Sequence, residues 1–243
     1  MEYLKIQISE SEAKGIALKY FGINGEASVL PGEIDFNFRI KTVNKSYILK
    51  VSRPDVDLNY LHFQDELLRH LENKCPNFDF PKTKRDSNGQ GIFDFQDRNC
   101  VNRKVRLLEW IAGELYSNFS PKNDDLRYSL GFSGGQIVNL LTDFDHNLSK
   151  RTFDWDIANG LWVEKNLEIF DEDEKEIIIY YLEKFKEIQP IYEHLRKSTI
   201  HNDANDNNII VDKIGGQVKA IIDYGDAVYS QIINDLSVIL AYA

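Results

Sequence analysis

The sequence predicts an α+β protein of two lobes: a small antiparallel-sheet lobe over residues 1–108 and a mainly helical lobe over residues 109–243. Two periodicities lead to this prediction. Runs that alternate between apolar and polar residues dominate the first hundred positions, and a period of two is typical of strands. Apolar residues then recur at helical spacing. A polar loop followed by two β-branched runs interrupts the helical half near residue 200.

The N-terminal lobe is expected to begin with a helix that is capped around Ser9 and ends near Gly22. A second helix is expected over residues 58–71, where leucines recur at helical spacing. The remaining stretches are expected to be strands, because they alternate and are bounded by turn residues. They are residues 27–30, 36–41, 46–51, a short run around Phe80, 91–95 and 102–108.

The second lobe is expected to contain at least three helices. One is indicated by an apolar stripe and another spans residues 174–191; the last begins near Leu236. The stripe consists of Ile137, Leu140, Leu141, Phe144 and Leu148. Length and composition fit two lobes of this kind, since 243 residues with 42% hydrophobic and 28% charged content are globular values.

Charge and cysteine content narrow the function classes. The formal net charge of −10 argues against a nucleic-acid or anionic-membrane partner and permits a cationic substrate. Two cysteines form no disulfide framework and no metal-binding spacing, which favours a reducing compartment. No apolar run reaches membrane-spanning length, and the first residues lack the apolar core of a signal peptide. We therefore expect a cytoplasmic protein; its oligomeric state stays open.

The polar loop carries the strongest functional signal. His201, Asp203 and Asn208 precede a β-branched run, and after a Gly-Gly turn a second run ends in Asp223. Phosphoryl transfer in kinase-like folds needs an Asp that acts on the acceptor hydroxyl. An Asn five residues later and an Asp beyond a hairpin both hold metal. This spacing predicts Asp203 as the catalytic base, with Asn208 and Asp223 as the ligands of a Mg²⁺ ion.

Three other interpretations of polar and glycine-rich motifs in this chain are less consistent with the sequence. A calcium loop needs Gly at its sixth position and Glu at its twelfth, where this chain has Asn208 and Ile214. A plain Asn/Asp-rich turn explains the composition of the loop but not the strand that ends in Asp223. The Gly131–Gly135 stretch matches a hydrolase elbow, but it lacks a preceding buried strand and is better interpreted as a glycine-rich helix entrance.

Lys50 ends the third expected strand and is the candidate lysine for binding nucleotide phosphates. Its acidic partner should lie on the next helix, where Glu66 is the chemically obvious candidate. Backbone amides from Ile34 to Asn37, in the turn before the second strand, are a weaker candidate for a phosphate cradle.

Acidic residues flank both the loop and a tryptophan. Asp206 and Asp226 lie near the predicted base in sequence, and Trp155 stands between Asp154 and Asp156. A cation is attracted both to such carboxylates and to the face of an indole ring. An alternative for the tryptophan segment is a solvated helix cap, because Asp favours that position.

The chain resembles the aminoglycoside phosphotransferase and choline kinase family. Within it, the likeness is strongest to hydroxylysine kinases and to modules fused to class III aminotransferases. The residues that carry the resemblance are 201–208, 221–226 and the ending 240–243, supported by 105–113 and 152–156. It covers essentially the whole chain, although the family usually continues with further helices. A shortened protein or a module of a longer one is therefore expected.

The resemblance implies a bilobal protein-kinase-like fold, Mg²⁺, and ATP or GTP as the phosphoryl donor. Transfer to a hydroxyl of a small amine-bearing substrate, with 5-hydroxylysine the leading candidate, is implied as well. Backbone groups of Glu109 and Ile111 would bind the nucleotide base, and the helix acid would fall nearer Gln64 than Glu66. The alternative function is a catalytically silent, kinase-like module that only binds nucleotide.

Overall fold

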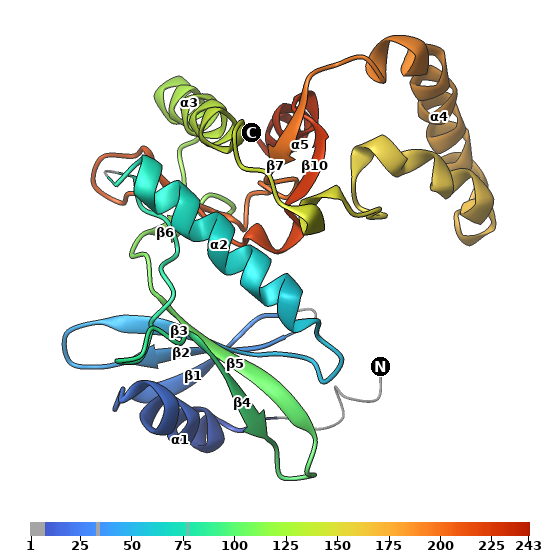
Figure 1. Ribbon diagram of the computed structural model, residues 1–243. Coiled ribbons are helices and arrows are strands. Elements are labelled where there is room, and N and C mark those ends of the chain that lie inside the picture. The colour runs from blue at the N-terminus through green and yellow to red at the C-terminus, as the bar shows by residue number, and fades with distance from the viewer. Residues whose placement is uncertain (1–7, 33–34, 77) are drawn as a thin grey trace. The chain divides into compact units, whose positions relative to one another are not determined.

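The computed structural model describes residues 8–32, 35–76 and 78–243. The chain forms two compact units: Met1–Arg69 with Asp79–Ala112, and His70–Phe78 with Gly113–Ala243. Helix α2 (Leu58–Lys74) continues from the first unit into the second. The expected α+β architecture is present, with an antiparallel sheet in the first unit and most of the helices in the second (Figure 1).

The first unit is built on a five-stranded antiparallel sheet with the order β1-β2-β3-β5-β4 (Figure 1). Each predicted strand that alternates with period two is confirmed to within two residues. The strands are β1 (Glu26–Leu30), β2 (Phe36–Lys41), β3 (Ser46–Val51), β4 (Ile92–Gln96) and β5 (Asn102–Glu109). β5 lies between β3 and β4, so residues far apart in sequence come side by side.

Helix α1 (Glu10–Phe21) covers one face of this sheet (Figure 1). Its predicted cap is confirmed: Ser9 and Glu12 form a capping box, and Gly22 ends the helix in the left-handed conformation with φ 66°. The buried side of α1 joins alternate residues of β2, β3 and β5 in one apolar core. Leu49 and Val51 point into that core. Lys50 lies between them and therefore points to the opposite face.

The predicted strand around Phe80 is wrong. Phe80 is buried but belongs to no strand, and the nearest pairing is an isolated bridge between Thr83 and Leu108. The physical reason follows directly in the sequence, because Pro81 has no N–H to donate to a sheet ladder. An apolar residue can thus serve the core without belonging to a strand.

The second unit contains α3 (Asp124–Leu141), α4 (Glu172–Tyr192) and α5 (Ile233–Tyr242), with the 3₁₀ segments η2 (Asn147–Lys150) and η3 (Ile157–Ile169). Two small antiparallel sheets complete it. One has the order β6-β8-β9 and the other pairs β10 with β7. Their strands are β6 (Glu114–Leu115), β7 (Lys197–Ile200), β8 (Ile209–Val211), β9 (Val218–Ile221) and β10 (Val228–Gln231).

Helix α3 corrects two predictions. The Gly131–Gly135 stretch is not the entrance of a helix, because α3 begins seven residues earlier, where Asn123 caps Leu126 N. Gly134 lies where α3 packs on α5, and a Cβ atom there would be only 2.3 Å from Ile239 Cδ1. The helix also ends at Leu141, so Phe144 and Leu148 of the predicted stripe lie outside it.

None of the helices in the described part of the chain combines the length and the apolar character needed to cross a membrane.

Candidate active site

The predicted catalytic loop connects β7 to β8, and the hairpin of β8 and β9 brings the end of the loop back beside its own downstream sequence. Ile209 pairs with Ile221. One residue further out, Ile222 N donates to Asn208 O at 2.8 Å. Asp223 follows directly, so the hairpin carries Asn208 and Asp223 at the same end of the small sheet.

Asp203 is held by two asparagine side chains of its own loop. Asn205 Nδ2 donates to Asp203 Oδ1 at 2.8 Å, and Asn208 Nδ2 donates to Asp203 Oδ2 at 2.7 Å. Asn208 Nδ2 also lies 2.8 Å from Asp203 O. The carboxylate therefore has a fixed orientation.

His201 links the loop to the segment that carries Asp223. Its Nδ1 accepts from Asp203 N at 3.1 Å, so its Nε2 is the donor to Ile222 O at 3.0 Å. Burial lowers the pKa of His201 to about 4. The ring is therefore neutral at pH 7, and it positions backbone on both sides of the site rather than acting as a base.

Asp235 on α5 was missed by the sequence reasoning. Its carboxylate accepts from His201 N at 3.0 Å and from Asn202 N at 2.7 Å, so one side chain holds two consecutive loop amides. Burial raises the pKa of Asp235 to about 6. In the sequence this residue looks like an ordinary acidic residue in the first turn of an apolar helix. Only the tertiary fold reveals its contact with the loop.

Asn208 and Asp223 have the donor atoms that a magnesium site needs. Since Asn208 Nδ2 is bound to Asp203, its Oδ1 is the atom left to face a ligand. Asp223 adopts a left-handed conformation with φ 62°, which re-aims its side chain directly after the strand. One amide oxygen and one carboxylate suit Mg²⁺, which takes oxygen ligands and completes its shell with phosphates and water. The residues therefore fit the predicted ion.

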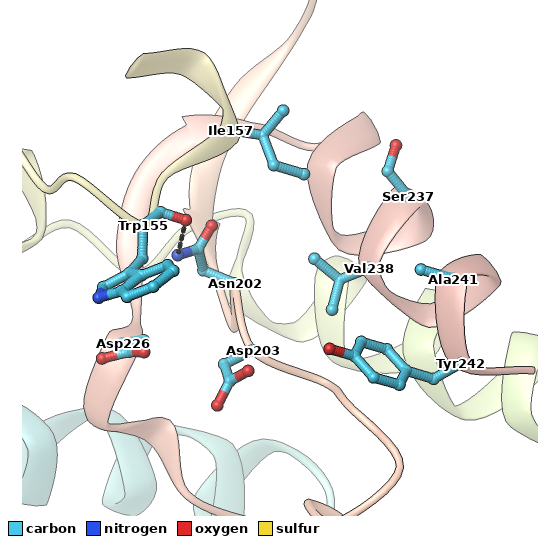
Figure 2. Close-up of a pocket in the computed structure, with 9 residues that line it drawn as sticks. All are labelled: Trp155, Ile157, Asn202, Asp203, Asp226, Ser237, Val238, Ala241 and Tyr242. Carbon is cyan, nitrogen blue, oxygen red and sulfur yellow. Dashed lines mark hydrogen bonds between the residues drawn. The ribbon is translucent and has the colours of Figure 1, made fainter. Parts of the chain in front are cut away.

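A pocket of about 270 Å³ opens beside Asp203 within the second unit (Figure 2). Its walls come from the predicted catalytic loop, from the start of η3 and the segment just before it, from the turn after β9 and from α5. The lining residues are Trp155, Ile157, Asn202, Asp203, Asp226, Ser237, Val238, Ala241 and Tyr242. This set contains two carboxylates and no Lys, Arg or His. Trp155 is 75% exposed, and Figure 2 shows its ring beside Asp226.

The acidic residues that flank Trp155 do not line the pocket. Asp154 is exposed, whereas Asp156 is buried, so the expected attraction of a cation cannot come from direct contact with Asp156. The alternative of a solvated cap is half right, since Asp156 Oδ1 accepts from Ala158 N at 3.0 Å at the start of η3, yet the side chain is inside the protein.

In the first unit, Lys50 and Arg106 are directly opposite each other on β3 and β5, so both point away from the α1 core. Helix α2 turns Gln64 toward this face, where Gln64 Oε1 accepts from Arg106 Nη1 at 2.6 Å. Glu66 lies on the exposed side of the same helix. The pairing of Lys50 with Glu66 stays a prediction. Arg106 is a further cation on this face that the sequence reasoning did not single out.

The other predicted nucleotide-binding groups lie at two ends of the sheet. Asn37 pairs with Lys50 across β2 and β3, and its Nδ2 donates to Pro31 O at 3.1 Å, while Ile34 lies outside the described residues. At the end of β5, Trp110 N donates to Ser46 O of β3. Backbone groups of Glu109 face the opposite side, where its N–H binds Lys82 O.

Comparisons with known proteins identify the family. A model of the phosphotransferase enzyme family matches residues 26–243 of the chain. This chain belongs to that family. Among curated relatives, hydroxylysine kinase of Mus musculus is 24% identical over 96% of the chain and 69% of the relative. Hydroxylysine kinase of Xenopus laevis is 23% identical over 98% of the chain and 70% of the relative.

Solved structures confirm the protein-kinase-like α+β fold. An amicoumacin kinase in complex with AMP-PNP and Ca²⁺ matches with a TM-score of 0.73 and 17% identity, over 98% of this chain and 70% of that one. A microcompartment-associated aminopropanol kinase matches with a TM-score of 0.74 and 17% identity, over 96% and 74%. A GDP complex of aminoglycoside 2′-phosphotransferase-IIIa has a TM-score of 0.68 and 16% identity, over 96% and 78%.

Proposed function

We propose that this phosphotransferase is a Mg²⁺-dependent kinase. It transfers the γ-phosphoryl group of ATP or GTP to a hydroxyl of a small amine-bearing acceptor. The observation that supports this most strongly is the loop geometry: Asp203 lines a pocket and is oriented by Asn205 and Asn208. The names of the curated relatives favour an acceptor like hydroxylysine.

Asp203 acts on the acceptor in this mechanism. An acceptor hydroxyl in the pocket donates to a carboxylate oxygen of Asp203, which orients it and takes up its proton as the new P–O bond forms. Asn205 and Asn208 hold the carboxylate before the acceptor arrives, so little reorganisation accompanies the reaction.

Asn208 Oδ1 and the Asp223 carboxylate would hold Mg²⁺, which supplies positive charge to the phosphate oxygens when bound. Lys50 is the candidate lysine for binding nucleotide phosphates. The base of the nucleotide would bind backbone groups of Glu109 and Ile111. The chain thus contributes binding, orientation and charge, which is most of what phosphoryl transfer requires.

The pocket favours a small cationic acceptor. Its volume of about 270 Å³ is below the range of about 300–1,000 Å³ that is usual for drug-sized ligands. This size suits a small acceptor. Two carboxylates in the lining attract positive charge, and the exposed Trp155 ring offers a face to an ammonium group.

A panel of acceptors tests this proposal. The chain is incubated with Mg²⁺ and either ATP or GTP, and 5-hydroxylysine, homoserine, ethanolamine, choline, an aminoglycoside and a neutral sugar are compared. We expect phosphorylation of a small amino alcohol at the highest kcat/KM. Preferential phosphorylation of the neutral sugar would contradict the acceptor class. Nucleotide binding without transfer to any compound would favour the alternative of a silent nucleotide-binding module.

A further inference from the structure

A buried carboxylate stands in the sequence between two residues of the pocket wall. Asp156 is 5% exposed and stands between Trp155 and Ile157, which both line the pocket. Its Oδ1 accepts from Ser230 Oγ at 2.7 Å, from Asn234 Nδ2 at 3.2 Å and from Ala158 N at 3.0 Å. These donors are a hydroxyl, an amide and a backbone N–H. Among the described residues, no ion pair of Asp156 is found.

A second carboxylate, that of Asp235, is also buried and hydrogen-bonded without an ion pair among the described residues. Asp235 is 3% exposed, and its partners are the backbone amides of His201 and Asn202. It is the neighbour of Asn234 at the start of α5, and the following turns of that helix form the pocket wall at Ser237, Val238, Ala241 and Tyr242. Both buried acids are thus hydrogen-bonded but have no cationic partner in the described part of the chain.

The amide of Asn202 adds an independent sign of a missing polar partner. Asn202 lines the pocket and is 5% exposed, and its Nδ2 donates to Trp155 O at 3.4 Å. Its Oδ1 is buried and accepts no hydrogen bond from a described residue. Figure 2 shows this oxygen on the side of Asn202 that faces Ile157 and Val238. An N–H or O–H donor in the pocket would satisfy it.

We propose that Asp156 is a specificity-determining residue, whose buried charge makes the pocket select an ammonium group over a neutral group of the same size. The inference rests on the proposed function, because it concerns the acceptor pocket. Asp156 does not touch the acceptor. It acts through the field that it adds to those of Asp203 and Asp226, while Ser230 and Asn234 keep its carboxylate in place.

The physical reason is the difference between a buried and an exposed charge. A carboxylate in solvent is screened by water and salt, whereas one inside the protein acts through a medium of lower dielectric constant. A bound ammonium group would supply the positive charge that the buried acids lack. Asp154 provides the matched comparison, because it carries the same charge two positions away on the exposed side of the segment.

Binding of a pair of probes to the full chain tests the proposal without relying on turnover. Dissociation constants for 2-aminoethanol and ethane-1,2-diol, which differ in one amino group, are measured by ligand-observed NMR in the wild type, Asp156→Asn and Asp154→Asn. We expect the wild type to prefer the amine by at least about tenfold. Asp156→Asn should reduce that preference about tenfold, and Asp154→Asn should change it by less than about twofold.

A second variant covers the case in which Asp156→Asn does not fold. Asp156→Ser removes the same carboxylate with a smaller polar side chain, and it should lose the amine preference in the same way. An unchanged amine preference, or an equal loss of affinity for both probes, in whichever of the two Asp156 variants folds would overturn the proposal. A wild type that binds the amine selectively but phosphorylates nothing would contradict the proposed function and leave this inference standing.

Discussion

The two units treat their buried acids in opposite ways. In the first unit, Asp97 is fully buried with Arg103, whose Nε lies 2.8 Å from Asp97 Oδ2. Burial alone would raise the pKa of Asp97, but Arg103 and the amides of Val101 and Asn99 hold it below its usual value. In the second unit, the hydrogen-bond partners of Asp235 among the described residues are backbone amides, and burial raises its pKa to about 6.

We interpret Asp97 as a charge that stabilises the fold and Asp235 as a charge that positions the predicted catalytic loop. The Asp97–Arg103 pair closes the turn between β4 and β5, and Arg103 Nη1 also donates to Ser52 O. Asp235 instead holds the loop that carries Asp203. A buried carboxylate without a cation lowers stability, so such a residue is expected where it has another role. Asp235 binds the backbone of the loop that carries Asp203, and we interpret its role as holding that loop.

The largest expected effect on stability comes from removing Asp97 from its buried ion pair with Arg103. Asp97→Ala should lower the free energy of unfolding by about 3–5 kcal/mol, because the Arg103 guanidinium is left buried without its carboxylate. Urea denaturation of the two proteins measures this difference. Asp94→Ala on β4 is the control. The Asp94 side chain is exposed, so its ion pair with Lys104 should contribute at most about 1 kcal/mol to the free energy of unfolding. Equal losses in both variants would contradict the contrast.

The corresponding change in the second unit should act on turnover more than on stability. In Asp235→Asn only one side-chain oxygen remains to accept from the amides of His201 and Asn202, so the loop loses part of its anchor. We expect kcat to fall by about 10- to 100-fold, which is about 1.4–2.7 kcal/mol. Nucleotide affinity should change little. A variant with unchanged kcat would show that the anchor does not position Asp203.

The pH dependence of stability sharpens the comparison further. His201 has a folded pKa of about 4 against 6.5, so its contribution to stability is lost as pH falls from 6.5 to 4. Asp235 has a folded pKa of about 6 against 3.8, so its contribution is gained over nearly the same fall in pH. Each change amounts to a few kcal/mol, and the two oppose one another.

Two variants separate these opposing effects of pH on the free energy of unfolding. Relative to the wild type, Asp235→Asn should lose stability on acidification from pH 6.5 to 4, whereas His201→Gln should gain it. Urea denaturation without Mg²⁺ at several pH values in this window gives both differences. Parallel curves for all three proteins would contradict the assignment of the two shifted groups.

The smallest effect concerns the partner of Lys50. Gln64 bonds to Arg106 on the face of the sheet that carries Lys50, whereas Glu66 is exposed. We therefore expect Gln64→Ala to weaken nucleotide binding by several-fold and Glu66→Gln to change it by less than about twofold, since an exposed ion pair contributes little. Fluorescence titration with a labelled nucleotide measures both. The reverse order would restore Glu66 as the helix partner.

The sequence predicted those parts of the molecule that depend on local periodicity or on fixed spacing. The strands of the first sheet alternate with period two, and Asp203, Asn208 and Asp223 belong to one loop and hairpin. The strand predicted around Phe80 was wrong because a proline follows that residue. The predicted extent of the helix over the apolar stripe was wrong because Phe144 and Leu148 continue the apolar pattern after α3 has ended.

The roles of Asp235 and Asp156 could not be predicted in this way. Each depends on contacts between residues more than thirty positions apart, such as His201 with Asp235 and Asp156 with Ser230. In the sequence both are acidic residues near helix starts, a position where Asp is common for local reasons. Only the tertiary structure distinguishes a buried anchor from an ordinary cap.

The central claim is that Asp203 acts on the acceptor hydroxyl, and the most direct measurement compares transfer with nucleotide binding in Asp203→Asn. The substitution keeps the size of the side chain and removes the proton acceptor. We expect phosphorylation of the best amino alcohol to fall by at least about 100-fold, while the dissociation constant of the Mg²⁺–nucleotide complex stays within about threefold. A variant that retains full transfer would contradict the claim.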